Sequence, residues 1–184
     1  MTARRSRGKA TLEAAEVTGP RRAARAREIA LRLLAARPRT EAQVRARLAR
    51  EELAGEAEAV ISWLRGLGYL DDAEYARARA GALLNPGRLG PQLVEKRLAQ
   101  EGIAPGAARA AVRQALEAGE EGGRGAAAAE LDLCRTLAER RARGTPLAAL
   151  DGKGRARLAR FLSGRGFGGR VVAAVLGIYV DGEG

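Results

Sequence analysis

The sequence contains no histidine and only one cysteine, Cys134, among its 184 residues. Without histidine the protein cannot build a histidine-based catalytic triad, use a histidine general base or bind zinc through histidine. A single cysteine allows neither an internal disulfide nor a CxxC pair, which suits a reducing cytoplasm. Cys134 belongs to an apolar series with Leu131 and Ala138, so we expect a buried structural thiol rather than a nucleophile.

Long apolar runs and aromatic residues are also scarce. No run of 18 or more apolar residues occurs, so we expect no transmembrane helix. The N-terminus is charged but lacks a following apolar segment, so we expect no signal peptide and a cytoplasmic protein. Aromatic residues make up 3% of the chain. Because alanine and arginine dominate instead, the composition predicts helices rather than strands.

Positive charge is abundant and unevenly placed, with a net charge of +11. Residues 1–28 carry +5, residues 29–123 carry +1 and residues 124–170 carry +7. Two basic regions around a nearly neutral middle indicate a polyanion or an acidic partner that is contacted at separated points. The alternative is a solvated basic surface that only keeps the protein in solution.

The beginning of the chain predicts an arm followed by two helices. Residues 1–20 are small, polar and basic, and we expect them to be mobile. Helical periodicity begins at Arg21 and ends before Pro38, because the residue preceding a proline is pushed out of the α region. Thr40 and Gln43 then form a capping box, in which each side chain bonds to the backbone amide of the other.

The same periodicity continues and predicts nine helices in groups of three. The segment 71–74 is acidic and opens one helix, where carboxylates accept from free amides. A carboxylate metal cluster is the alternative there, but nothing else in the chain supplies matching acidic ligands. Three other helices are expected over residues 91–100, 105–118 and 153–162. Two apolar stripes are expected to face inward, Val60, Ile61, Leu64 and Leu67 before Gly68, and Val172, Val175, Leu176 and Tyr179 near the C-terminus.

An internal sequence repeat supports this grouping. Residues 47–53 align with residues 97–103, and residues 161–167 form a more diverged third copy. The spacings of 50 and 64 residues fall within or slightly beyond the range of helical arrays. Because one three-helix unit buries little surface alone, we expect an elongated all-α array of stacked units. The expected division is an arm over 1–24, repeats over 25–70 and 71–121, and a diverged third repeat with a short tail over 122–184.

The segment Gly68-Tyr69-Leu70-Asp71-Asp72-Ala73-Glu74-Tyr75-Ala76 closely resembles the signature of RecX-family regulatory proteins. Gly90-Pro91-Gln92-Leu93 and residues 98–103 follow in the order of that family and at similar spacing. The similarity is good over residues 25–117 and weaker beyond. The chain departs from the family at Gly81-Ala82-Leu83-Leu84, where a basic residue is usual, and in a loop over residues 144–152 that is rich in glycine and proline.

The resemblance implies a curved molecule of tandem three-helix repeats that lodges in the groove of a RecA filament. It also implies inhibition of RecA ATP hydrolysis, strand exchange and co-protease activity. We expect a monomer without enzymatic activity, cofactor, metal or membrane partner. DNA is expected to be bound without sequence preference. Single-stranded DNA is the main expected partner, and double-stranded DNA is a second one. A stand-alone DNA-binding protein is the main alternative. An enzyme is a weaker alternative, because no GxxxxGK[ST] motif occurs.

Basic residues on the predicted helices are the candidates for these contacts. Arginine pairs bidentately with both phosphate and carboxylate, so it suits DNA as well as an acidic filament surface. For each residue, a solvated charge on a helix face is the alternative. The candidates are Arg37, Arg39, Arg45 and Arg47 in the first repeat, Arg88, Lys96 and Arg97 in the second, and Lys153, Arg155, Arg157, Arg160 and Arg165 in the third.

Overall fold

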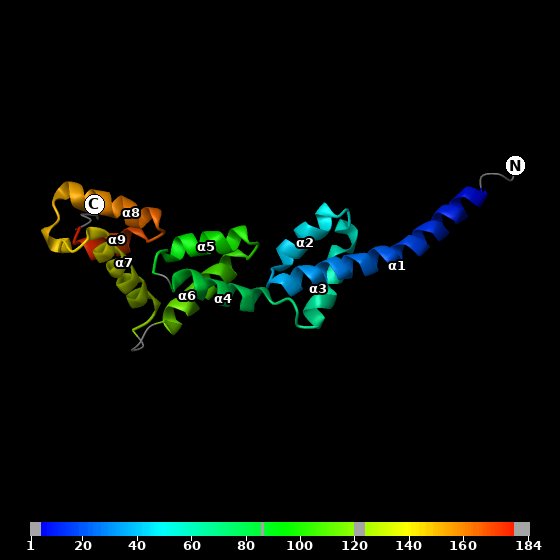
Figure 1. Ribbon diagram of the computed structural model, residues 1–184, viewed down its shortest axis with the longest axis horizontal. Coiled ribbons are helices and arrows are strands. Elements are labelled where there is room, and N and C mark those ends of the chain that lie inside the picture. The colour runs from blue at the N-terminus through cyan, green and yellow to red at the C-terminus, as the bar shows by residue number, and fades with distance from the viewer. Residues whose placement is uncertain (1–4, 86, 120–123, 179–184) are drawn as a thin grey trace, which may run out of the picture. The chain divides into compact units, whose positions relative to one another are not determined.

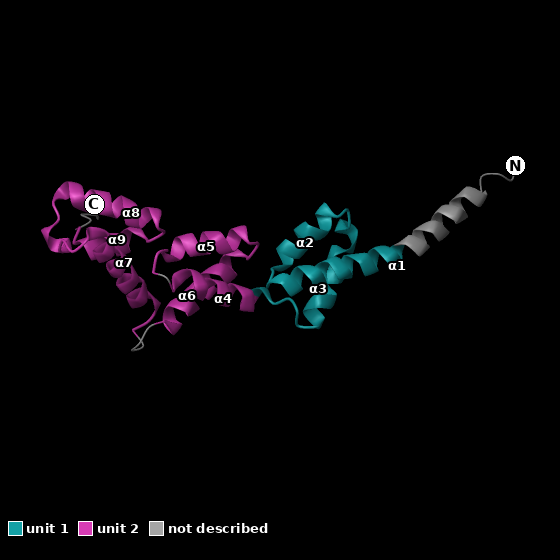
Figure 2. Cartoon of the chain, viewed as in Figure 1, with its two compact units in different colours: residues 1–72 teal, residues 73–184 magenta. Residues whose placement is uncertain are grey.

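The computed structural model describes residues 5–85, 87–119 and 124–178, with side chains from residue 19 onward. Within these ranges it contains nine α-helices, two short 3-10 helices and no strand, which confirms the all-α prediction. The chain divides into two compact units, residues 1–72 and residues 73–184 (Figure 2). One three-helix group lies in the first unit and two lie in the second.

The first unit packs three helices around a single apolar core (Figure 1). Leu67 was expected in this core but is 53% exposed. The reason is that the third helix ends at Gly66, so Leu67 already belongs to the turn, and Leu70 enters the core instead, being 2% exposed. The elements are α1 (Arg5–Ala36), α2 (Glu41–Arg50), η1 (Ala54–Glu56) and α3 (Ala57–Gly66).

The first helix begins earlier than the sequence predicted. We expected a start at Arg21, but α1 begins at Arg5 and contains Pro20. A proline removes one helical hydrogen bond, and the alanine- and arginine-rich residues around it are strong helix formers. The arm predicted over residues 1–24 lies mostly outside the residues whose side chains are described.

The start of α2 is capped from two sides. Thr40 Oγ1 accepts from the Gln43 amide at 3.2 Å, as predicted. The reverse half of the capping box is absent, because Gln43 Oε1 is buried without a hydrogen-bond partner. The Asp72 carboxylate accepts from the amide of Glu41 at 2.9 Å. Asp72 therefore caps α2 across the first unit, a role that its place at the start of the next helix did not predict.

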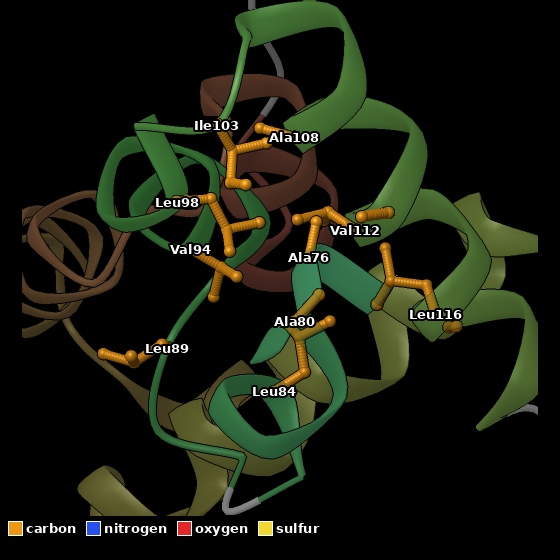
Figure 3. Packing of buried hydrophobic residues seen from close by; sticks show 12 residues of the cluster. Ala76, Ala80, Leu84, Leu89, Val94, Leu98, Ile103, Ala108, Val112 and Leu116 are labelled. Carbon is orange, nitrogen blue, oxygen red and sulfur yellow. The ribbon is translucent and has the colours of Figure 1, made fainter. Parts of the chain in front are cut away.

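The first helix group of the second unit consists of α4 (Asp72–Leu84), whose first residue still belongs to the first unit, α5 (Pro91–Gln100) and α6 (Pro105–Ala118). Figure 3 shows how apolar side chains of these three helices converge on one core. Proline occupies the first position of both α5 and α6, where its missing N–H has no helical partner to lose. These starts confirm the expected helix boundaries.

The unit continues with a second group that has its own core. Its central side chain is Phe167, which is 2% exposed. Tyr179, expected in the last apolar stripe, lies outside the described residues. The elements are α7 (Ala126–Ala142), η2 (Leu147–Ala149), α8 (Gly152–Gly164) and α9 (Gly169–Leu176).

The internal sequence repeat corresponds to one turn that recurs after α2, α5 and α8. In each turn the carbonyl of a buried leucine accepts from the amide of a buried apolar residue five positions later, which satisfies the end of the helix. The residue before that apolar position has a positive φ, which favours glycine. The three bonds are Leu53 to Leu48 at 2.9 Å, Ile103 to Leu98 at 3.0 Å and Phe167 to Leu162 at 3.3 Å.

Glu52 is the exception among these turns. Its φ is 61°, whereas the matching positions are Gly102 and Gly166. We expect Glu52→Gly to raise the free energy of unfolding by about 0.5–1 kcal/mol, because glycine removes the left-handed strain but is more flexible when unfolded. Urea unfolding followed by circular dichroism measures this change. Glu52→Ala removes the same carboxylate but keeps the strain, so an equal gain in both variants would contradict the explanation.

Candidate functional site

Two of the predicted contact residues are already neutralised within the first unit. Arg45 Nε lies 2.6 Å from Glu58 Oε1, and this hydrogen bond lowers the pKa of Glu58 below its usual value. Arg47 pairs with Glu51 on the next turn of α2 at 2.8 Å. A guanidinium that is held by a carboxylate has fewer free donors and a partly neutralised charge, so it binds another anion less tightly. Arg45 and Arg47 are therefore weaker candidates than the sequence suggested.

The other two candidates of this unit have no ion pair among the described residues. Arg39 lies in an open groove of about 600 Å³ between α1 and α2, whereas Arg37 is exposed outside it. Arg39 Nε and Gln43 Oε1 in this groove are both buried without a hydrogen-bond partner. Apolar groups form part of the wall, including Ile29 and Leu33. The groove, which we call the α1–α2 groove, also contains the cations Arg32, Arg47 and Arg50.

The candidates of the second repeat are exposed. Arg88, Lys96 and Arg97 form no ion pair with any described carboxylate. A different arginine of this repeat has a structural role, since Arg79 on α4 pairs with Glu101 after α5 at 2.9 Å. The three candidates therefore keep their charges available to solvent or to a partner.

The third repeat has few acidic groups to neutralise its cations. Residues 135–178 contain ten basic and two acidic side chains. Among the described residues, none of these ten cations forms an ion pair. Of the candidates, Lys153, Arg157 and Arg160 are exposed. Arg155 instead donates to the Ala148 carbonyl at 3.0 Å, so part of its guanidinium serves the fold.

The backbones of the second and third repeats meet at two glycines. The Gly90 amide donates to the Arg165 carbonyl at 2.7 Å, and the Gln92 amide donates to the Gly166 carbonyl at 3.0 Å. A Cβ atom on Gly90 would lie 2.5 Å from the Gly166 carbonyl oxygen, and one on Gly166 would lie 2.5 Å from Leu93 Cβ. Only glycine permits this approach at the two positions.

Four arginines gather around this contact, and we call them the junction cluster: Arg88, Arg140, Arg141 and Arg165. Arg88 is an exposed residue of the loop that ends at Gly90. A Cβ atom added to Gly87 in the same loop would lie 3.7 Å from a guanidinium nitrogen of Arg140. The guanidinium carbons of Arg141 and Arg165 lie 5.2 and 5.0 Å from the Phe161 ring centre.

The sequence identified only half of the junction cluster. Arg88 and Arg165 were among the candidates, whereas Arg140 and Arg141 were not. Their adjacency in the sequence, in what the structure shows to be the last turn of α7, was a visible signal. Their proximity to the loop over 87–90 was not visible, because it depends on contacts between residues about fifty positions apart.

Cys134 is buried, as predicted. Burial raises the pKa of its thiol to about 11, and the charge of Glu130 adds to this effect. A thiol with so high a pKa is almost wholly protonated at neutral pH, so it is a poor nucleophile. In the described part of the chain, no group of three metal-ligating side chains is found. None of the helices described is long and apolar enough to cross a membrane.

Two models of protein families match the chain. One describes the first three-helix domain of RecX and matches residues 26–64, and the other describes its third three-helix domain and matches residues 128–176. Solved structures agree with this fold. The crystal structure of RecX from Lactobacillus salivarius superposes with a TM-score of 0.69 at 18% identity, covering 87% of this chain and 99% of that one. Another RecX crystal structure gives 0.69 at 22% identity, with 88% and 76% covered.

Curated relatives extend the similarity to the sequence. The regulatory protein RecX of Lacticaseibacillus paracasei is 38% identical over 79 residues, which is 42% of this chain but only 33% of the relative. The chain thus matches about a third of that relative's length. The regulatory protein RecX of Trichlorobacter lovleyi is 31% identical over 139 residues, which covers 75% of this chain and 84% of the relative. Since this match spans most of both sequences, the chain belongs to the RecX family of regulatory proteins.

Proposed function

We propose that this protein is a non-enzymatic cytoplasmic regulator that binds a RecA–DNA filament and mainly inhibits it. The affected activities are RecA ATP hydrolysis, strand exchange and co-protease activity. The observation that carries the proposal is the 31% identity to a regulatory RecX protein over three-quarters of the chain. The unpaired guanidinium groups on helix surfaces support it, because they bind carboxylates and phosphates without transforming them.

Inhibition in this proposal is steric and thermodynamic. A ligand shifts a conformational equilibrium only by its differential affinity for the two states. The regulator must therefore bind the resting filament more tightly than the rearranged one that hydrolysis and strand exchange require. Helical repeats with separate cores present several contact surfaces on one chain, and several contacts to one filament raise the total affinity.

The α1–α2 groove is the surface that we assign to the filament protein. Arg39 and Arg50 supply unpaired cations for an acidic side chain, and Ile29 and Leu33 supply an apolar wall beside them. A protein segment with acidic and apolar side chains matches both features. A phosphodiester backbone matches only the first.

The test is RecA ATP hydrolysis on single-stranded DNA, titrated with this protein over a salt series. We expect hydrolysis to fall with added protein, and the inhibition to weaken as salt rises. Combining Arg39→Gln with Arg50→Gln should raise the half-inhibitory concentration about tenfold, since two charge-assisted contacts are lost. The control combines Arg65→Gln with Arg77→Gln, which removes two ion-paired arginines and should change little.

Unchanged hydrolysis at several-micromolar protein would overturn the proposed role. The rival function is a DNA-binding protein that only masks single strands, and the many unpaired cations of the third repeat favour it. An excess of DNA over the regulator separates the two functions. Masking then disappears because most DNA stays free, whereas inhibition through the filament persists.

A further inference from the structure

We infer that the junction cluster is the surface on which this protein binds the phosphodiester backbone of single-stranded nucleic acid. The inference rests on the proposed function, because it assigns the DNA contact of the filament complex to Arg88, Arg140, Arg141 and Arg165. It also implies that the ion-paired arginines of the chain contribute little to that contact.

The first argument is that none of these four cations forms an ion pair among the described residues. The third repeat contains only two carboxylates over residues 135–178, Glu139 and Asp151. Asp151 is occupied as the cap of α8, where it accepts from the Gly154 amide at 2.7 Å. The first unit shows the opposite arrangement, in which carboxylates hold arginines such as Arg65 and Arg45. Like charges kept close together repel one another, and an anion that lies between them relieves this repulsion.

The second argument is the geometry of Arg141 and Arg165. Both guanidinium carbons lie about 5 Å from the centre of the Phe161 ring, so they are within about 10 Å of one another. A cation–π contact uses the face of the ring and the charge of the guanidinium. It leaves N–H donors at the edge of each guanidinium available for phosphate oxygens. The ring thus holds two phosphate-binding groups within about 10 Å of one another.

The third argument is that the backbone builds this surface. The bond from the Gly90 amide to the Arg165 carbonyl holds the Arg88 loop against the end of α8. The contact brings cations of two repeats together, and it exists only because Gly90 and Gly166 lack a Cβ. Groups that are held in place before binding lose less entropy when the ligand arrives.

Nucleic acid fits this surface better than an acidic peptide does. The large apolar side chains that are exposed in the described residues are Leu31, Leu67, Tyr69 and Ile178, and none lies on the segments 87–90, 140–141 or 161–166 that carry the junction cluster. An acidic peptide would leave its apolar side chains without a binding site there. Phe161 is half-buried and associated with two guanidiniums, so base stacking on it is not expected. The contact is therefore made to phosphates, with little base preference.

The experiment measures binding of the full chain to a fluorescein-labelled oligothymidine of thirty nucleotides. Fluorescence anisotropy gives the affinity over a series of potassium chloride concentrations. The test variant combines Arg88→Gln, Arg140→Gln, Arg141→Gln and Arg165→Gln. The slope of log K against log salt should fall by about 2.8, since each lost phosphate contact removes about 0.7, and affinity near 0.1 M salt should fall by roughly 100-fold or more.

The matched control removes four exposed arginines that are ion-paired: Arg25→Gln, Arg65→Gln, Arg77→Gln and Arg113→Gln. It loses the same charge, yet its affinity should change less than about threefold, because each of these arginines already has a carboxylate partner. Thermal unfolding establishes that both variants fold. If the fourfold junction variant does not fold, Arg88→Gln with Arg140→Gln avoids the Phe161 contacts and should lower the slope by about 1.4.

Equal losses in test and control variants would overturn the inference, because binding would then follow net charge alone. Unchanged binding by the test variant would overturn it as well. Tighter binding of polyglutamate than of oligothymidine, lost in the test variant, would assign the surface to an acidic protein instead. RecA hydrolysis tests the proposed function separately. Wild-type protein that fails to inhibit RecA but binds oligothymidine through the cluster contradicts the proposed function and leaves this inference standing.

Discussion

Replacing Gly166 by alanine is expected to lower the free energy of unfolding of the second compact unit by about 3 kcal/mol or more. Gly166 has a φ of 91°, a conformation that strains any L side chain. Its Cβ would also lie 2.5 Å from Leu93 Cβ and would collide with the Leu93 amide nitrogen. The strain and the collision add together, because the α5 backbone cannot move away without losing the bond from Gln92 to the Gly166 carbonyl.

Urea unfolding monitored by circular dichroism measures this loss. Gly164→Ala is the matched control, since Gly164 ends the same helix and a Cβ there would have no neighbour within 4 Å. Alanine is the better helix former, so the control should be neutral or slightly more stable. If Gly166→Ala proves as stable as the control, then Gly166 does not lie against Leu93.

Phe167→Ala is expected to cost about 3–5 kcal/mol of unfolding free energy, the range for removing a large side chain from a core. Phe167 is 2% exposed and occupies the apolar position that Leu53 and Ile103 occupy in the other repeats. It is the largest fully buried side chain described. Its removal leaves a cavity beside Leu162, and the turn that holds both residues limits how far the backbone can close it.

Phe161→Ala provides the comparison within the same helix group. The Phe161 ring is half-buried, so its removal exposes less apolar surface and should cost about half as much. Equilibrium unfolding of both variants measures the difference. An equal cost would mean that Phe161, and not Phe167, is central to the third repeat. The Phe161 variant should also weaken oligothymidine binding, because Arg141 and Arg165 lose the ring that holds them.

Much of the helical pattern was predictable because its signals are local. Pro91 and Pro105 mark helix starts, since proline lacks the donor that a first position does not need. The repeated spacing from Leu98 to Ile103 marks a turn that requires only neighbouring backbone groups. The local signals were wrong where two tendencies compete. Helix propensity around Pro20 outweighed the proline, so α1 starts at Arg5 rather than at Arg21.

The functional surfaces were less predictable. The charge of an arginine is visible in the sequence, but the carboxylate that neutralises it depends on the tertiary structure. Arg45 and Arg140 look alike in the sequence, each on a helix among alanines and arginines. Arg45 is neutralised by Glu58, thirteen residues away, whereas Arg140 has no ion pair among the described residues. A list of basic residues therefore included neutralised ones and missed half of the junction cluster.

By itself, the sequence determined that the protein is helical, that its helices recur in a three-helix pattern and that it lacks histidine chemistry. These properties follow from composition and from spacings of a few residues, which each segment carries independently. Only the tertiary structure decided which arginines are held by carboxylates and that Gly90 lies against Gly166. Those contacts join residues far apart in the chain, and they depend on how the helices pack rather than on any local preference.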